Sequence, residues 1–467
     1  MPTLVFLWTD VLLWLIVALG LVFAWAASRH EHLREPWRRV LRSPVGVGTG
    51  LVLAVFICIG LLDSVHFRGG AASPAEGANG QVLSLFDHLA GPLRVNQEKT
   101  YSAPLSTRQF TKENLDTGEG GQVRDYPRLK YGGAHLEDPA RDQSGDMAAT
   151  VAGGLVRAAL VWSLMVILLG LREARRRGQA LRGSLRAMFA AGQDFPWRTL
   201  LFVSAALLGL GFVAAQVGTQ YHLLGTDKVG EDVFYQALKS IRTGLVIGTL
   251  TTLVMLPAAL FLGVAAGYFR GWVDDVIQYL YTTLNSIPGV LLIAAAVLMM
   301  QVYMDTHADA FRTVVERADM QLLFLCLILG VTSWTSLCRL LRGEALKLRE
   351  LDYVQAAHAF GVGHLTVLGR HVLPNVMHIV IITLVLDFSG LVLAEAVLSY
   401  VGIGVDPTTY SWGNMINSAR LELAREPVVW WSLAAALVFM FSLVLAANLF
   451  SDVVRDAFDP RLRGERS

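Results

Sequence analysis

Two carboxylates that could do chemistry lie in an otherwise apolar stretch of the chain. Asp387 and Glu395 are eight residues apart, about two helical turns, so both lie near one face of a helix with Ser389 close by. A charged group inside a membrane costs roughly 2.5–3.5 kcal/mol on insertion scales and is a functional candidate by default. Two interpretations are open. The carboxylates either form a polar stripe that faces a water-filled pore, or each pairs with a backbone group or a neighbouring helix and stabilises the bundle. We favour the first for Asp387 and the second for Glu395.

Three histidines recur every seven residues, a spacing from which a metal site could be imagined. They are His364, His371 and His378. Gly369 and Pro374 argue against one continuous helix across them, and no cluster of carboxylates accompanies them. We therefore expect no metal site.

Signatures of nucleotide or covalent chemistry are missing from the sequence. There is no Gly-x-x-x-x-Gly-Lys-Ser/Thr loop, so we expect the chain neither to bind nor to hydrolyse ATP. The absence of His-Glu-x-x-His, and of histidines within most apolar stretches, disfavours an intramembrane enzyme. The cysteines stand in apolar runs without CxxC spacing and are interpreted as small buried residues: Cys58, Cys326 and Cys338. We expect no catalytic residue and no cofactor in this chain.

The composition indicates a membrane protein. Of 467 residues, 54% are hydrophobic and only 16% are charged, whereas soluble domains have about 25% charged residues. The net charge of +1 gives no basic excess that would favour nucleic acid. A membrane-spanning helix needs roughly 20 apolar residues. Nine stretches qualify: 4–27, 45–62, 149–171, 199–217, 240–266, 276–302, 320–341, 376–400 and 428–450.

The distribution of Lys and Arg predicts the orientation, because short cytoplasmic loops are enriched in both. One set of loops holds 21 of these cations: 28–44, 172–198, 269–275, 342–375 and the tail from Asp452. The short loops on the other side hold 5: 218–236, 305–319 and 401–427. We expect the N-terminus outside, the C-terminus in the cytoplasm and a multi-pass chain in contact with lipid.

The chain divides into four predicted parts. Residues 1–62 form two spans, and 63–148 form a polar extracytoplasmic insertion rich in glycine pairs. Residues 149–198 form a third span and a basic segment, and 199–467 form the remaining core with a cytoplasmic tail. For the insertion, an ordered lobe and a loose loop are both open. Its candidate core residues are Leu83, Leu85, Phe86, Tyr101, Phe110, Tyr126 and Tyr131. The segment 172–198 is interpreted as a basic amphipathic helix on the inner membrane face, with a solvated loop as the alternative.

The most informative segment is the cytoplasmic loop 342–375. Asp352 is expected to cap a short helix, and Gly361 or Gly363 to supply the positive φ that ends it. The alanines of this helix leave a slim surface: Ala356, Ala357 and Ala359. Pro374 follows near the start of the next span, where its missing N–H is harmless. A slim exposed helix of this kind is suited to being gripped by another protein.

At this point the sequence resembles a known family, the binding-protein-dependent ABC transporter permeases of the dipeptide/oligopeptide type. Their loop reads Tyr-Val-Glu-Ala-Ala, a Gly, then Arg-His-Ile-Leu-Pro-Asn, and Gln355 replaces the Glu here. The resemblance is to the second, C-type subunit in an enlarged N-terminal form. It implies these ATPase-coupling residues: Tyr353, Gln355, Ala356, Ala357, Ala359, Gly361, Arg370 and Pro374.

Further matches to the family extend over about 250 residues. The segment 224–233 resembles its periplasmic motif, with Glu231 in place of Arg; the matching residues are Gly225, Thr226, Asp227, Gly230 and Asp232. Other matching segments are 267–274, 286–289, 395–405 with 411–413, and 455–463. The pore or gate candidates are Asn285, Ser286, Pro288, Asp387, Glu395 and Ser399.

The nine apolar stretches predict an all-α polytopic helical bundle of about nine transmembrane helices, and the resemblance implies a type I ABC importer core in its C-terminal part. The first 195 residues, with three spans and the insertion, go beyond the usual six-span member of the family. It implies a heterodimeric pore with a second permease subunit, two ABC ATPases that hold ATP and Mg, and an extracytoplasmic solute-binding protein. The membrane is the bacterial cytoplasmic (inner) membrane. Dipeptides and oligopeptides are the implied substrates, with nickel chelates and glutathione open. An ion-coupled secondary transporter is the alternative, which paired inverted repeats would indicate.

Overall fold

The chain folds almost entirely into helices, as the sequence predicts. The computed structural model describes residues 3–29, 31–68, 82–116, 122–190, 194–307 and 313–458. Its helices are α1 (Trp8–Arg29), α2 (Glu31–Arg42), α3 (Pro44–Asp63), α4 (Leu85–Leu89), α5 (Gly91–Val95), α6 (Pro139–Arg177), α7 (Leu181–Phe189), α8 (Trp197–Gly218), α9 (Val233–Phe269), α10 (Trp272–Asn285), α11 (Gly289–Thr306), α12 (Val314–Arg349), α13 (Asp352–Ala359), α14 (His364–Val367), the π-helix η2 (Leu368–Val372), α15 (Leu373–Val401), α16 (Trp412–Glu422) and α17 (Trp431–Phe458). The tail motif 459–463 and the glycines at 69–70, 118 and 120–121 lie outside the described residues.

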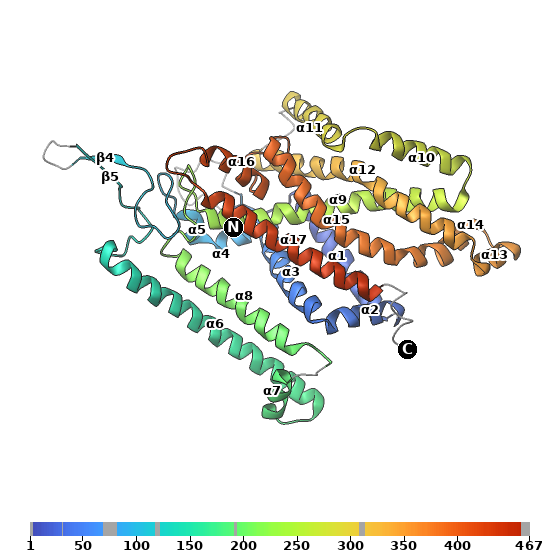
Figure 1. Ribbon diagram of the computed structural model, residues 1–467, viewed down its shortest axis with the longest axis horizontal. Coiled ribbons are helices and arrows are strands. Elements are labelled where there is room, and N and C mark those ends of the chain that lie inside the picture. The colour runs from blue at the N-terminus through green and yellow to red at the C-terminus, as the bar shows by residue number, and fades with distance from the viewer. Residues whose placement is uncertain are drawn as a thin grey trace. The chain divides into compact units, whose positions relative to one another are not determined.

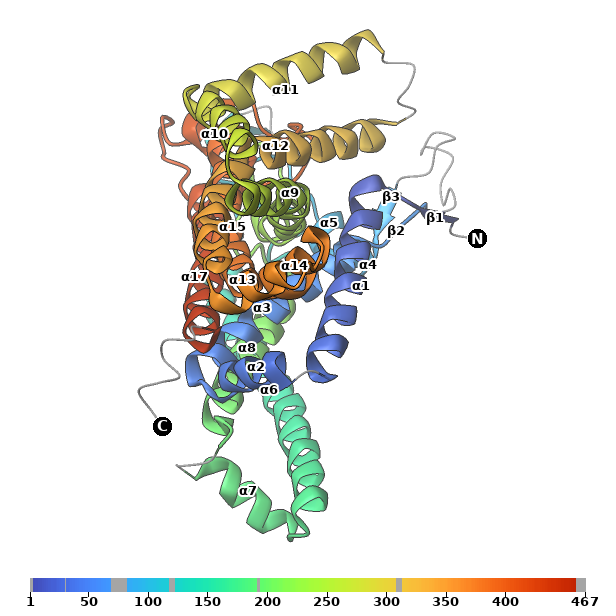
Figure 2. The same cartoon turned by 90° about the vertical axis from the view of Figure 1, so that its right-hand side faces the viewer.

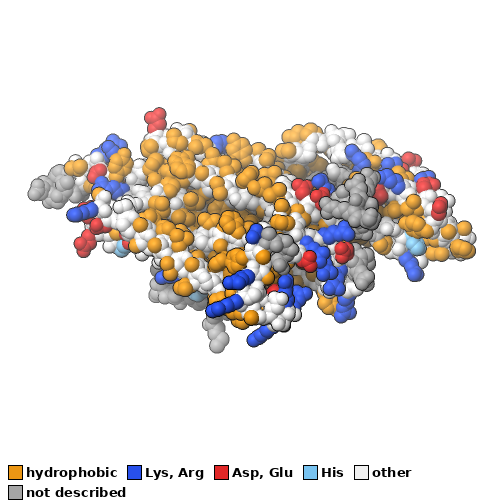
Figure 3. All heavy atoms as spheres, turned by 60° about the horizontal axis from the view of Figure 1, so that its bottom comes forward, with side chains coloured by type: hydrophobic (Ala, Val, Ile, Leu, Met, Phe, Trp, Pro, Cys, Tyr) orange, Lys and Arg blue, Asp and Glu red, His pale blue; other side chains and the backbone are white. Residues whose placement is uncertain are grey.

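Within the described ranges, nine helices are long and apolar enough to cross a membrane. They are Trp8–Ala26, Pro44–Asp63, Pro139–Arg177, Trp197–Gly218, Val233–Phe269, Gly289–Thr306, Val314–Arg349, His364–Val401 and Trp431–Phe458. Their surfaces carry large exposed apolar side chains such as Phe202 and Leu210, which are 76% and 71% exposed. Figure 3 shows hydrophobic side chains over much of one face of the molecule. Lipid tails are the natural environment for such a surface.

The predicted sixth span, 276–302, is wrong as a single helix. The chain forms α10 and α11 instead, and the helix breaks at residues 286–288. Pro288 lacks the N–H for a helical hydrogen bond and disfavours the α conformation at Ile287, so α10 ends before it and α11 begins after it. Asn285 at the break accepts a hydrogen bond from the Thr335 hydroxyl, with 3.1 Å between oxygens.

The chain separates into two compact units, which we describe one at a time. The first comprises Met1–Leu4, Trp37–Arg242 and Tyr410–Val453. In it, α6 and α8 lie side by side, with α7 at the end where one leads into the other (Figures 1 and 2). Buried Val166, Met188 and Leu201 hold the three helices together. The predicted amphipathic helix over 172–198 is shorter than expected, because α6 continues through Arg177 and leaves only the nine residues of α7.

The insertion folds as a small lobe of this first unit in the parts described. Strands β1 (Thr3–Val5), β2 (His66–Arg68) and β3 (Val82–Ser84) form one sheet, in which Phe67 is opposite Leu83. A separate hairpin pairs β4 (Glu113–Asp116) with β5 (Gln122–Asp125), with Leu115 opposite Val123. The core predicted for the insertion is partly right: Phe86 and Tyr101 are buried, whereas Tyr126 is exposed.

The second unit comprises Val5–Pro36, Thr243–Thr409 and Val454–Ser467. Its core runs along α9, α12 and α15 and includes buried Met255, Leu337 and Val376. Glycines let two of these helices approach closely: a Cβ at Gly267 of α9 would lie 2.5 Å from the carbonyl oxygen of Arg342 in α12. In α1, the backbone N–H of Thr9 donates to Asp319 of α12 at 3.3 Å. Figure 1 shows α13 and α14 beyond the ends of α12 and α15.

Candidate functional site

Helix α13 begins one residue earlier than the sequence suggests. Leu351, in an extended conformation, is the N-cap residue and makes no side-chain capping hydrogen bond. Asp352 is therefore the first helical residue, and its predicted capping role is wrong. Its carboxylate still lies in the first turn, where the helix dipole favours a negative charge.

The end of α13 is set by Gly361, one of the two glycines proposed for this role. Gly361 has φ +77°, whereas Gly363 has φ −61° and caps α14. The N–H of Gly361 donates to the carbonyl of His358 at 2.9 Å, and the N–H of Val362 donates to that of Ala357 at 3.0 Å. This pair of hydrogen bonds is a Schellman motif, which requires the left-handed conformation at Gly361.

The two faces of α13 have different surroundings. Val354 is fully buried and Ala357 is half-buried, and both pack on the core of the second unit. Tyr353, Gln355, Ala356 and Ala359 are exposed. Two large apolar side chains beside this slim surface protrude much further: Phe360 is 87% exposed and Leu365 is 84% exposed. The sequence interpretation missed both, although apolar residues flanking a glycine in a polar cytoplasmic loop were a usable signal.

The other coupling candidates lie around α13 without forming a closed pocket. Gln355 donates from Nε2 to the carbonyl of Glu350 at 3.2 Å, and the phenol oxygen of Tyr353 accepts from Asn375 at 3.1 Å. Arg370 is exposed in the π-helical turn η2, and Pro374 lies in the first turn of α15. The exposed side chains of α13 and η2 leave a surface that another protein can contact.

The polar candidates in the membrane segments fall into separate groups. Glu395 is buried and accepts a hydrogen bond from the Ser399 hydroxyl at 2.7 Å; Ser399 in turn accepts from the N–H of Val405 at 3.3 Å. Asp387, two turns earlier, is half-buried, and the structure shows no hydrogen bond or ion pair to it from the residues described. Ser286, at the α10–α11 break, is exposed and donates to the carbonyl of Thr282 at 2.8 Å.

The motif 224–233 forms a second site in the first unit, where it contacts the insertion. The Thr226 hydroxyl accepts from the N–H of Ser102 at 2.7 Å and donates to the carbonyl of Thr100 at 2.9 Å. The indole N–H of Trp431 donates to the carbonyl of Thr226 at 2.9 Å. Thr226 therefore ties the insertion to the start of α17.

The acidic residues of this motif shape the turn before α9. Asp227 accepts from the backbone N–H groups of Val229 and Glu231, each at 2.9 Å. Glu231, which stands where the family has Arg, accepts from the Tyr410 hydroxyl, and burial raises the pKa of Glu231. Gly230 has φ +78°, and a Cβ there would lie 1.8 Å from the carbonyl oxygen of Glu98. A larger residue at this position is therefore excluded.

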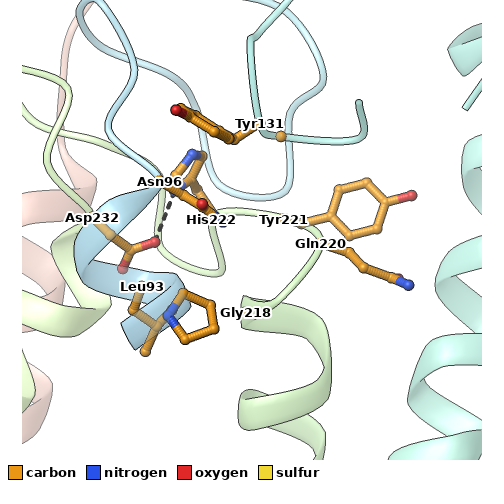
Figure 4. A pocket seen from close by; sticks show the side chains of 10 residues that line it. Leu93, Asn96, Tyr131, Gly218, Gln220, Tyr221, His222 and Asp232 are labelled. Atoms are coloured by element: carbon orange, nitrogen blue, oxygen red, sulfur yellow. Dashed lines mark hydrogen bonds and ion pairs between the residues drawn. The ribbon is translucent and has the colours of Figure 1, made fainter. Parts of the chain in front are cut away.

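A buried charged cluster lies where the motif contacts the insertion. His222 Nδ1 hydrogen-bonds Asp232 at 2.8 Å, as Figure 4 shows, while its Nε2 lies 3.5 Å from Glu98 Oε1, at the outer limit of a hydrogen bond. Glu98 also accepts from the N–H groups of Lys130, Tyr131 and Gly132 at 2.8, 2.8 and 3.1 Å. Only the Leu224–Val233 part of this cluster was predicted as a motif, since Glu98 and His222 carry no local signal.

The charges in this cluster shift one another's pKa values. Burial alone would raise the pKa of Glu98, but His222 and the three backbone donors hold it at about 2. Burial alone would lower the pKa of His222, but Asp232 and Glu98 raise it to about 9. At neutral pH the cluster therefore contains a protonated imidazole between two carboxylates.

We expect the lobe to be most stable between about pH 5 and 6.5. The Glu98 contribution is complete above its unfolded pKa and is lost as pH falls toward 2, whereas the His222 contribution is complete below its unfolded pKa and is lost as pH rises through 9. Limited proteolysis of the lobe across this range measures the change. In His222→Gln the alkaline loss should disappear; an unchanged alkaline loss would contradict the assignment.

The fold and these loops define a polytopic α-helical transport protein of the membrane. The model of the binding-protein-dependent transport system inner membrane component matches residues 259–464. The chain is 32% identical over 244 residues to the glutathione transport system permease protein GsiD of Pectobacterium atrosepticum, covering 52% of this chain and 73% of that one. It is 31% identical over 304 residues to the oligopeptide transport system permease protein OppC of Mycobacterium tuberculosis, covering 63% and 97%. The dipeptide transport system permease protein DppC of Bacillus subtilis is 27% identical over 242 residues, covering 52% and 69%.

The chain belongs to this family of ABC importer permeases. It is a multi-pass inner membrane protein, and its relatives are permease subunits of transport systems. The matches to the first two relatives span 52% and 63% of the chain, and the family model begins at residue 259, so much of the N-terminal part lies outside the shared region. The family prediction made from the loop 342–375 is confirmed.

Proposed function

We propose that this permease imports dipeptides, oligopeptides or a small peptide such as glutathione. The support comes from the names of its relatives, which are permeases of glutathione, oligopeptide and dipeptide transport systems. It forms half of a pore with a second permease subunit and receives solute from an extracytoplasmic binding protein. The half-buried carboxylate of Asp387 contributes to the wet path, while Glu395, bonded to Ser399, stabilises the turn that follows α15.

Helix α13 docks on cytoplasmic ATPases that hold ATP and Mg, and it transmits their ATP-driven movement to the membrane helices. The observation that carries this proposal is the slim exposed face of α13, flanked by Phe360 and Leu365, on a helix whose opposite face is anchored by Val354. Such a helix can transmit a push as a rigid body, because its buried face moves with α12 and α15. The C-terminus is cytoplasmic and the N-terminus extracytoplasmic in this arrangement.

Replacing Gly361 by proline tests the coupling. Proline fixes φ near −65° and cannot adopt the +77° of Gly361, so α13 loses its terminating turn. We expect uptake of labelled di- to hexapeptides and glutathione, by the complex with its partner subunits, to fall about tenfold or more. ATP hydrolysis should continue, uncoupled from transport.

Gly363→Ala is the matched control, because Gly363 has φ −61° and a Cβ added there would meet no neighbouring atom within 4 Å. This variant should transport like the wild type. Wild-type uptake by the Gly361→Pro complex would overturn the coupling assignment, and a wild-type complex that imports none of these peptides would overturn the proposed substrate class.

A further inference from the structure

One buried phenol in the second unit holds the coupling segment by two hydrogen bonds. Tyr268, near the end of α9, is only 3% exposed. Its hydroxyl lies 3.0 Å from His358 Nε2 on α13 and 3.0 Å from His364 Nδ1 at the start of α14. The consecutive helices α13 and α14 therefore meet the distant end of α9 at one oxygen atom.

The backbone around this phenol is fixed independently. The guanidinium of Arg349, at the end of α12, donates to the carbonyl of Tyr268 at 2.6 Å. The ring of Phe269 packs edge-on against His364, with 5.9 Å between centroids. The Tyr268 side chain is therefore held in the core of the second unit. His358, by contrast, is half-buried, and His364 is exposed.

The hydrogen-bonding chemistry of the three groups makes this contact specific. A phenol hydroxyl donates one hydrogen bond and also accepts, so one imidazole can accept the phenol proton while the other donates its N–H to the phenol oxygen. The two imidazole rings lie close together, with 5.3 Å between centroids, because both reach the same oxygen atom.

The structure shows polar contacts of both imidazole rings to the phenol oxygen. Among the described residues, neither histidine forms an ion pair with a carboxylate. Loss of the phenol hydroxyl would therefore remove the hydrogen bonds that attach both imidazole rings to α9.

We propose that Tyr268 is a positioning residue for energy coupling: with His358 and His364 it forms a clasp that holds α13 and α14 to the end of α9. The inference rests on the proposed coupling role of α13. It assigns to Tyr268 no contact with substrate or nucleotide. Tyr268 keeps α13 attached to α9, so that the two helices move together.

Hydrogen exchange of the α13 amides tests the clasp in the complete complex with the partner permease and ATPases. After correction for intrinsic exchange rates, protection in Tyr268→Phe should be about two- to fivefold lower than in the wild type, the scale of one hydrogen bond. ATP hydrolysis by the variant complex should continue, while less peptide is imported for each ATP hydrolysed.

Tyr303→Phe is the matched control, because Tyr303 is 55% exposed and its phenol makes no hydrogen bond to a described residue. It should behave like the wild type. If Tyr268→Phe fails to assemble, His364→Asn, at an exposed position, should lower the protection of the α13 amides by a similar factor. Wild-type protection in the assembled Tyr268→Phe complex, or in His364→Asn, would overturn the clasp. Failure of the wild-type chain to bind ATPases would instead overturn the proposed function.

Discussion

Replacing Phe360 with aspartate is expected to cost this permease most of its affinity for the ATPases. The Phe360 ring is 87% exposed beside α13, so the folded permease loses little packing when it is removed. In the complex the ring would be buried, and truncating a central apolar residue of an interface costs about 2 kcal/mol or more. That corresponds to about a 30-fold increase in Kd, and a buried aspartate adds a desolvation cost.

The measurement is the affinity of the ATPase subunits for the purified permease pair. Leu365→Asp should have a similar effect, because Leu365 is 84% exposed next to the same helix. Phe189→Asp, in α7, is the matched control: Phe189 is an exposed phenylalanine in a segment that we also place in the cytoplasm. Equal affinities for the Phe360→Asp and Phe189→Asp permeases would exclude the α13 surface as the docking site.

Removing the carboxylate of Glu98 is expected to unfold the extracytoplasmic lobe locally. In Glu98→Ala, the protonated His222 loses one of its two carboxylate neighbours, and three backbone N–H groups lose their acceptor. Breaking a buried ion pair by removing one partner costs about 3–5 kcal/mol. A loss of this size should expose the lobe to protease and lower the thermal unfolding temperature of the purified protein.

Glu113→Ala separates this effect from the general loss of a surface charge. Glu113 pairs with Lys99 at 2.8 Å, but the lysine side chain is 70% exposed, and such pairs contribute about 0–1 kcal/mol. The protease sensitivity of Glu113→Ala should therefore remain near the wild-type level. If Glu98→Ala were equally resistant, the cluster would contribute no net stability to the lobe.

Features of the coupling loop show how far local sequence rules extend. The sequence predicted that a glycine with positive φ ends α13, but it left Gly361 and Gly363 open, and the structure shows that Gly361 completes the Schellman motif. The start of α13 was not predicted correctly, because Leu351 and not Asp352 is the N-cap residue. The same limit applies to α10 and α11, because only the structure shows that two separate helices form on either side of Pro288.

The clusters that join distant segments were invisible in the sequence. Ser102 and Thr226 are 124 residues apart, yet they share a hydrogen bond. The neighbours of Glu98 and the two histidines on Tyr268 are likewise set by how the helices pack. A polar residue in a loop looks the same in sequence whether it is solvated or buried beside a charge.

The sequence alone determined that this is a polytopic helical membrane protein and that its C-terminal part carries the motifs of the permease family, among them the loop 342–375. These properties follow from composition, helix length and short motifs, because water, lipid and backbone hydrogen bonding act on each segment locally. The tertiary structure decided which faces are exposed, where Phe360 and Leu365 protrude, and which charges are buried together. Those outcomes depend on contacts between segments far apart in the chain, and no local pattern encodes them.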